Sequence, residues 1–203
     1  VQTEVMEKYH DIGTSVNISV LNWLQGLPTK NFLLSSFPEG EKISGEIFAE
    51  KHLLRRFSCA GCPIGCVHIA ALKTAFSEHH EFEVRRVSYD YEPIYSLGSN
   101  LGVKTAEGIL QLIDVCERLG LDVMSAGVVL SWATEALEKK LITEKDTMGL
   151  PLQWNGVEGY AKALEIMVRA PNEFYASLAR GAEYGAKKYG GLEYAMTLGG
   201  NEV

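Results

Sequence analysis

Three cysteines stand close together in the segment CAGCPIGC, where Cys59, Cys62 and Cys66 follow a C-x2-C-x3-C spacing. Thiolates are soft ligands that suit zinc, copper(I) and iron–sulfur clusters. Structural zinc usually takes two separate pairs of ligands, and the second pair is missing here. Three closely spaced cysteines with one remote ligand are typical of a cuboidal iron–sulfur cluster. Pro63 and Gly65 permit the tight backbone that such a loop needs.

The fourth ligand of such a cluster is harder to find in this sequence. The remaining cysteine, Cys116, falls on the same apolar stripe as Ile109 and Ile113, and a lone cysteine there is more often a core residue than a ligand. Zinc therefore stays an alternative for the loop.

His68 follows the loop and could donate a hydrogen bond to a thiolate, whereas the adjacent histidines 79 and 80 are interpreted as solvated.

Composition limits the classes of function. The chain has 203 residues, enough for one or two domains, and a net charge of -7, which argues against a nucleic-acid partner. Its apolar runs are far shorter than the ~20 residues of a membrane span. Crowded cysteines outside a disulfide framework favour a reducing compartment, so we expect a cytoplasmic location. Its ends, Val1 and the segment LGGNEV, lead us to expect an excised part of a longer polypeptide.

Helical periodicity dominates the sequence and predicts a mostly α, multi-helical single domain over residues 1–203, with little strand. A helix over Ile43–Phe57 is expected to lead into the cysteine loop. Another begins at the capping residue Thr105 and ends at Gly120. Asn172 is expected to cap one final helix that continues to Gly190.

Strand signals are weak. Phe82 and Val84 alternate with charged residues, which predicts a short hairpin arm, and the segment YAMTLGG near the end of the chain could be extended. The sequence therefore predicts only short pieces of strand beside the helices.

Two further segments accompany the cysteines: YEPIYSLGSNLG at residues 91–102 and CERLGLDV at residues 116–123. Together and in this order, the three segments resemble the aldehyde:ferredoxin oxidoreductase family of tungsten-bis-pterin enzymes. LPTKNF at residues 27–32 and the C-terminal GGNEV resemble further segments of that family. The resemblance covers nearly the whole chain and implies the helical fold of the family's middle domain.

The resemblance also implies which residues hold the cofactors. The cluster loop, residues 58–67, carries three ligands of a 4Fe–4S cluster, and the fourth lies in a later D-x-x-G-L-C motif that this chain does not reach. The first pterin motif of the family, D-x-x-G-L-D, matches the pterin loop, residues 117–123, with Glu117 in place of the first aspartate and Gly120, Leu121 and Asp122 at the last three positions. From the residues alone, the same stretch could be a glycine-terminated helix followed by an N-capping aspartate.

The glutamate that lies beside the tungsten in the family matches Glu92, which the resemblance marks as catalytic. A carboxyl among apolar neighbours would have a raised pKa, which would let it take or give a proton near neutrality. The plainer interpretation is a solvated turn residue before Pro93.

The resemblance implies oxidation of an aldehyde to a carboxylic acid by a tungsten or molybdenum bis-pterin, with a 4Fe–4S cluster that passes electrons to ferredoxin. The N- and C-terminal domains of the same enzyme would complete the site, so the isolated chain is expected to be inactive and to lack both cofactors. One alternative is a member of the same family that reduces a ring or carboxylate, which the long segment between Cys66 and Tyr91 keeps open. Another is a non-catalytic iron–sulfur or zinc module, and a homo-oligomer remains open.

Overall fold

The computed structural model describes residues 3–76 and 81–203, and the histidines 79 and 80 lie outside this part. As the sequence predicted, the chain is mostly helical and its strands are few. The helices are α1 (Glu4–Ile12), α2 (Asn17–Trp23), α3 (Gly45–Lys51), α4 (Tyr91–Leu97), α5 (Ala106–Leu119), α6 (Val123–Glu138), α7 (Val157–Arg169), α8 (Glu173–Leu178) and α9 (Ala182–Tyr189). The strands are β1 (Leu53–Phe57), β2 (Val67–Ala75), β3 (Phe82–Tyr89), β4 (Thr197–Leu198) and β5 (Asn201–Glu202).

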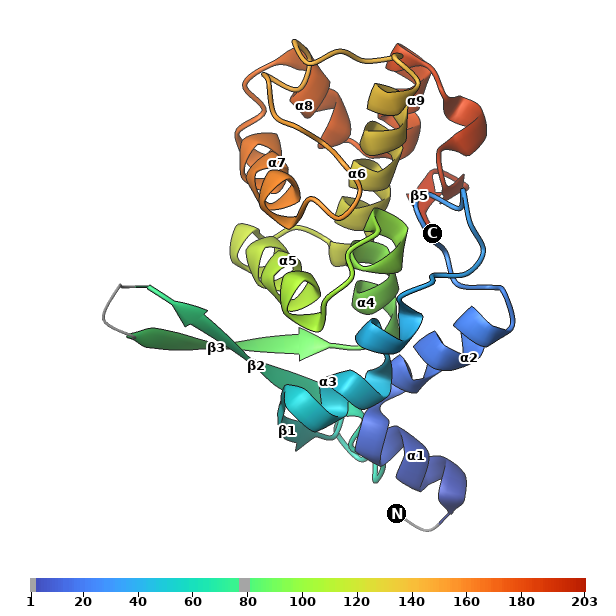
Figure 1. Ribbon diagram of the computed structural model, residues 1–203, viewed down its shortest axis with the longest axis vertical. Helices are drawn as coiled ribbons and strands as arrows, with labels where there is room; N and C mark the ends of the chain where they lie inside the picture. The colour runs from blue at the N-terminus through green and yellow to red at the C-terminus, as the bar shows by residue number, and fades with distance from the viewer. Residues whose placement is uncertain (1–2, 77–80) are drawn as a thin grey trace.

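Strands β1, β2 and β3 form an antiparallel sheet in sequence order, with His68 opposite Tyr89 and Ala75 opposite Phe82 along β2 and β3. Side chains alternate between the two faces of a strand, and β2 buries every second residue over its first half. Helix α5 packs against β2 and β3, and α3 contacts β1 (Figure 1). The sheet is therefore packed by α3, which precedes it in the sequence, and by α5, which follows it.

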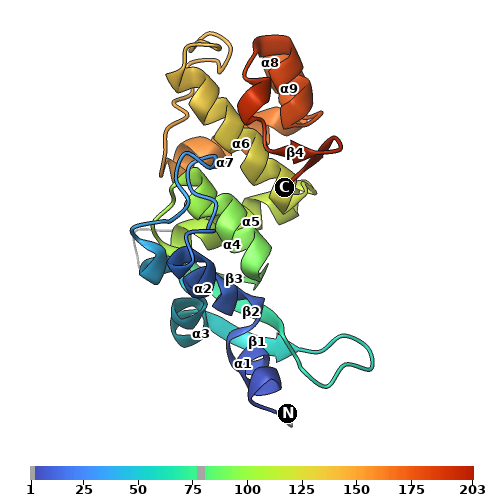
Figure 2. The same cartoon turned by 90° about the vertical axis from the view of Figure 1, so that its right-hand side faces the viewer.

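The helices α6 to α9 gather at the end of the molecule away from α1 and the sheet (Figure 2). Helix α6 contacts α4 and α9, and α5 contacts α7, so the apolar stripes of these helices share one core. Fully buried aromatic side chains fill that core: Trp132, Tyr160, Phe174 and Tyr175. Within residues 3–76 and 81–203, helices long and apolar enough to cross a membrane are absent.

The helix expected over Ile43–Phe57 is wrong in its second half. Ser44 caps α3 by accepting a hydrogen bond from the backbone of Ile47, but the helix ends at Lys51 and the chain continues as strand β1. Residues 67–75 offer a partner strand in the middle of the sheet, and pairing with it outweighs the helical preference of the leucines and arginines in LLRRF. The hairpin arm expected around Phe82 is confirmed as β3.

The end of the chain also differs from the expectation of one final helix. Asn172 caps α8 as predicted, accepting from the backbone N–H of Tyr175, but the chain breaks at Gly181 and α9 is separate. Gly181 has φ +103°, and a Cβ there would lie 2.5 Å from the Glu202 carboxylate. The break therefore makes room for a side chain from the C-terminal strand.

Helices α4 and α6 cross at Gly127, and the close contact predicts a large response to one methyl group. A Cβ at Gly127 would lie 2.5 Å from the carbonyl oxygen of Ser96. Alanine is favoured over glycine in a helix by about 1 kcal/mol, but overpacking costs about 1–3 kcal/mol and occasionally more. We expect Gly127→Ala to lower the free energy of unfolding by up to about 2 kcal/mol in urea denaturation. Lys162→Ala, on the exposed side of α7, is the control, and a more stable Gly127→Ala variant would contradict the packing.

Candidate functional site

The three cysteines lie on the loop that joins strands β1 and β2. The paired segments end at Phe57 and Val67, so residues 58–66 form the hairpin connection. Gly61 and Gly65 have φ values of +75° and +71°, a left-handed conformation that glycine adopts without steric cost. The sheet thus fixes both ends of the loop, and two glycines let the backbone turn tightly between them.

All three loop cysteines are free thiols; Cys59 is exposed, and Cys62 and Cys66 are half-buried. The N–H of Cys62 donates to the carbonyl of Cys59 at 3.0 Å. Three thiols from one loop match the ligand type that iron–sulfur clusters use. In the conformation of residues 3–76 and 81–203, groups of three metal-ligating side chains close enough to share an ion are absent. The donor set therefore fits a cluster in kind, and it needs a further ligand.

Cys116 does not supply that ligand in this structure. It is fully buried on α5 among core side chains, as the sequence predicted. Burial raises the pKa of its thiol to about 12, with smaller contributions from the charges of Asp122 and Glu117. Because the thiolate is the metal-binding form, a thiol held protonated in the core is a poor ligand.

The pterin loop is the junction between α5 and α6. Gly120 ends α5 with φ +69°, and the next N–H, that of Leu121, donates back to the carbonyl of Cys116 at 2.9 Å. Asp122 caps α6 by accepting from the N–H of Ser125 at 2.7 Å. The plain interpretation of a glycine-terminated helix and a capping aspartate is therefore confirmed. One capping bond leaves Asp122 further acceptor capacity.

A cavity of about 520 Å³ opens beside this junction. Its polar lining comes from three separate parts of the chain: Asp122, Ser125, Arg180 and Glu202. The Glu202 carboxylate accepts from the Ser125 hydroxyl at 3.2 Å and from the N–H of Ala182 at 2.8 Å. The C-terminal strand is thereby fastened to the first turns of α6 and α9. Sequence reasoning missed Glu202 as a site residue, although the GGNEV segment around it was the available signal.

Glu117 lies apart from this cavity. It is on the last turn of α5 and is absent from the cavity lining, whereas Leu121 and Asp122 belong to it. Burial raises the pKa of Glu117, the neighbouring charge of Asp114 raises it further, and a backbone hydrogen bond from Ser88 opposes them. The two carboxylates of the motif are therefore not brought to the same cavity within this chain.

Glu92 lies in the first turn of α4 and is exposed, so the expectation of a carboxyl surrounded by apolar neighbours is wrong for this chain. The residue two positions earlier, Asp90, is exposed as well. Partial burial raises its pKa to about 6, and the charge of Glu92 adds to the shift, although Asp90 keeps solvent-exposed surface. Asp90 is therefore a group able to exchange a proton near neutrality, and sequence reasoning missed it.

The LPTKNF and GSNLG segments lie against each other. Lys30, Asn31 and Phe32 all have φ between +49° and +56°, a conformation that costs energy in residues other than glycine. Their backbone is held by hydrogen bonds from Lys30 N–H to the Ser99 carbonyl and from Asn31 N–H to the Asn100 carbonyl, at 3.0 and 3.2 Å. Strain of this kind persists only where the surroundings enforce it, and it concentrates at functional sites.

The whole chain, residues 1–203, matches the family model described as aldehyde ferredoxin oxidoreductase, domains 2 and 3. It is 32% identical over 187 residues to the tungsten-containing aldehyde ferredoxin oxidoreductase of Pyrococcus furiosus, and 32% identical over 189 residues to that of Thermococcus kodakarensis. Each comparison covers 92% of this chain and 29% of the relative. This chain therefore spans less than a third of the length of these relatives.

Among solved structures, the active-site complex BamBC of benzoyl coenzyme A reductase, in complex with 1,5-dienoyl-CoA, has the same fold. The TM-score is 0.59 at 24% identity, over 78% of this chain and 23% of the other. The match of the family model over every residue decides the relationship. The chain belongs to the aldehyde ferredoxin oxidoreductase family.

Proposed function

We propose that the full-length protein is a cytoplasmic tungsten–pterin oxidoreductase that oxidises an aldehyde to a carboxylic acid and passes the electrons through a 4Fe–4S cluster to ferredoxin. One observation supports the proposal most directly. The pterin loop and the C-terminal strand, far apart in the sequence, meet at one cavity through Asp122, Ser125 and Glu202. Both segments are the ones that resemble the family. The N- and C-terminal domains of the enzyme are proposed to complete the site around this 203-residue domain.

The bound tungsten–pterin centre would supply the oxidation, in which an aldehyde gains the oxygen of a water molecule and releases two electrons and two protons. In this proposal Leu121 and Asp122 contact the pterin, and the carboxylate of Asp122 accepts from a ring N–H with the lone pairs that capping leaves free. The space beside Gly120 is open within this chain, since a Cβ there would meet nothing within 4 Å. Glu117, one methylene longer than the aspartate of the family motif, lies outside this cavity, so in this proposal it would contact the cofactor only in the assembled enzyme.

The protons released in the reaction need an acceptor. We assign that role to Glu92, with Asp90 beside it as the neighbouring acid whose pKa of about 6 suits the same exchange. Cys59, Cys62 and Cys66 are proposed as three ligands of the cluster, and the fourth is assigned to a downstream domain of the enzyme.

Metal and sulfide analysis of the full-length protein, prepared anaerobically, tests this proposal. We expect tungsten, iron and acid-labile sulfide together, with ferredoxin reduced when an aldehyde is added. Detection of zinc without acid-labile sulfide would contradict the assignment of a 4Fe–4S cluster. Iron and sulfide with neither tungsten nor molybdenum would favour a non-catalytic electron-transfer module. Turnover of an aromatic or carboxylate substrate in place of the aldehyde would favour a reductase of the same family.

A further inference from the structure

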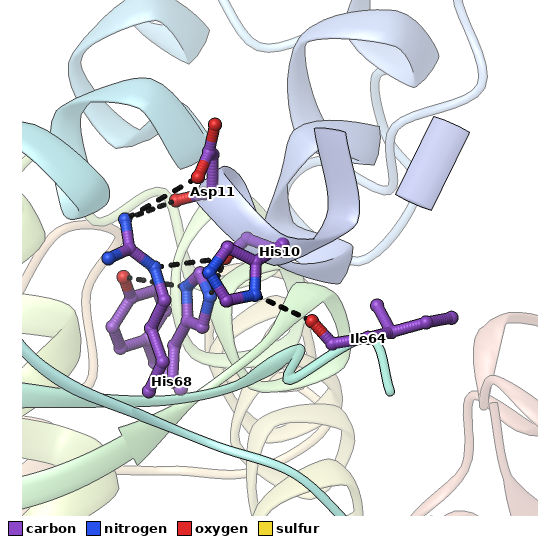
Figure 3. A network of polar contacts seen from close by, with 6 residues as sticks. His10, Asp11, Ile64 and His68 are labelled. Carbon is purple, nitrogen blue, oxygen red and sulfur yellow. Dashed lines mark hydrogen bonds and ion pairs between the residues drawn. The ribbon is translucent and has the colours of Figure 1, made fainter. Parts of the chain in front are cut away.

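The last turn of α1 touches the cysteine loop. His10 Nδ1 lies 2.6 Å from the carbonyl oxygen of Ile64, which stands between Cys62 and Cys66 (Figure 3). A carbonyl oxygen can only accept, so Nδ1 carries the hydrogen and donates it. A side chain more than fifty residues earlier in the sequence thus holds the backbone of the loop at its middle.

The backbone of His10 is itself fixed from two sides (Figure 3). Its carbonyl accepts from His68 Nε2 at 2.9 Å and from Arg56 Nε at 3.0 Å. The other ring nitrogen of His68 lies 3.3 Å from the hydroxyl of Tyr89. Both nitrogens of the buried His68 are therefore engaged with His10 and Tyr89, so the hydrogen bond to a thiolate that the sequence left possible is not formed in this structure.

Two glycines allow these approaches. A Cβ at Gly65 would lie 3.1 Å from His10 Nδ1, and a Cβ at Gly13 would lie 3.1 Å from His68 Nδ1. Both glycines have positive φ, at +71° and +77°, so other residues would be strained there in any case. Glycine at both positions thus allows α1 and the cysteine loop to approach each other closely.

The same short segment also holds the start of α4. The hydroxyl oxygen of Thr14 accepts from the N–H of Tyr91 at 3.0 Å, next to Glu92. Residues 10–14 therefore contact both the cysteine loop and the segment that carries the proposed catalytic carboxylate.

We propose that His10 is a positioning residue for the cluster, and that its hydrogen bond to Ile64 holds the loop in the conformation that presents Cys62 and Cys66 to the iron. The inference rests on the proposed function, because it needs a cluster in the loop. Loss of the bond leaves the loop held by its two strand ends and its thiolate–iron bonds alone, so that it opens more often and exposes the cluster to solvent.

The test uses full-length protein prepared anaerobically and measures the rate at which a ferrous chelator removes iron. His10→Leu removes the donor, and His10→Asn keeps one, since the amide nitrogen of asparagine can take the place of Nδ1. We expect iron release to be about three- to tenfold faster in His10→Leu, the range for one lost hydrogen bond, and within about twofold of wild type in His10→Asn. Lys8→Leu, exposed on the same helix, is the control and should match wild type.

The outcomes separate the two proposals. A wild-type protein without iron and sulfide would overturn the proposed function. A wild-type cluster that His10→Leu releases at the wild-type rate, or that His10→Asn releases as fast as His10→Leu, would overturn the role of His10 alone. If His10→Leu does not fold, the comparison of His10→Asn with His10→Gln tests the role of His10. The glutamine amide reaches past the Nδ1 position and cannot replace its hydrogen bond. Equal rates of iron release from these two variants would therefore overturn the inference.

Discussion

Glu92→Gln in the full-length enzyme is expected to lower kcat by about 10²–10⁴-fold, the contribution of a positioned acid or base, while tungsten, iron and sulfide contents stay at wild-type levels. The amide keeps the size of the side chain and removes its titratable proton. Glu92 is exposed in the first turn of α4, so the change in folding stability should stay within about 0.5 kcal/mol. Steady-state kinetics together with metal analysis of the same preparation measure both quantities.

Two further variants make this result specific. Glu165→Gln, the same chemical change on the exposed side of α7, should leave turnover unchanged. Asp90→Asn tests the neighbour whose pKa lies at about 6. If Asp90→Asn loses the turnover and Glu92→Gln keeps it with intact cofactors, the proton-transfer role belongs to Asp90 and the assignment to Glu92 is wrong.

The two ends of α5 and the start of α6 were predictable because their causes are local. The side chain of Thr105 accepts from the N–H of Gly108, three residues on. At the other end of α5, the backbone N–H of Gly120 donates to the last carbonyls of the helix. Asp122 likewise caps α6 through Ser125. Such signals depend on a few neighbouring residues and their allowed φ angles, so the sequence carries them directly. The apolar stripe that buries Cys116 is local in the same sense.

The sheet and the contacts of the site were not predictable in this way. Strand β1 forms because residues 67–75 pair with it. The local sequence LLRRF does not by itself determine a strand. The contact of His10 with Ile64 spans 54 residues and that of Ser125 with Glu202 spans 77. These partners are brought together only by the packing of whole elements, and their residue types are common in any helix or strand.

The exposed position of Glu92 shows a further limit. The resemblance predicts a role for Glu92, but the environment of this residue depends on what covers the start of α4, and this chain spans 29% of the length of its relatives. The same holds for Glu117, which lies apart from the cavity that Asp122 lines. A site assembled from several domains can be located by sequence on one of them, while the burial and pKa of its residues are set by all of them.

The four cysteines give the other large expected effect. In the full-length enzyme, Cys62→Ala is expected to remove most of the iron and sulfide and the visible absorbance of the cluster, because a cluster held by the remaining thiolates is exposed and labile. Cys116→Ala should retain the full cluster, since its thiol is buried in the core with a pKa of about 12. Its cost should be confined to stability, about 1 kcal/mol for a buried group the size of one methylene.

The same reasoning applies to this chain on its own. It carries three thiols on the loop 58–66 and a fourth that is closed inside the core, so the isolated 203-residue chain should be purified without a cluster, with its loop thiols free, oxidised or bound to zinc. Anaerobic purification followed by a visible spectrum and by iron, sulfide and zinc analysis measures this. An intact cluster in the isolated chain that disappears in Cys116→Ala would show that α5 releases its cysteine to the loop. The ligand assigned to a downstream domain would then be Cys116 itself.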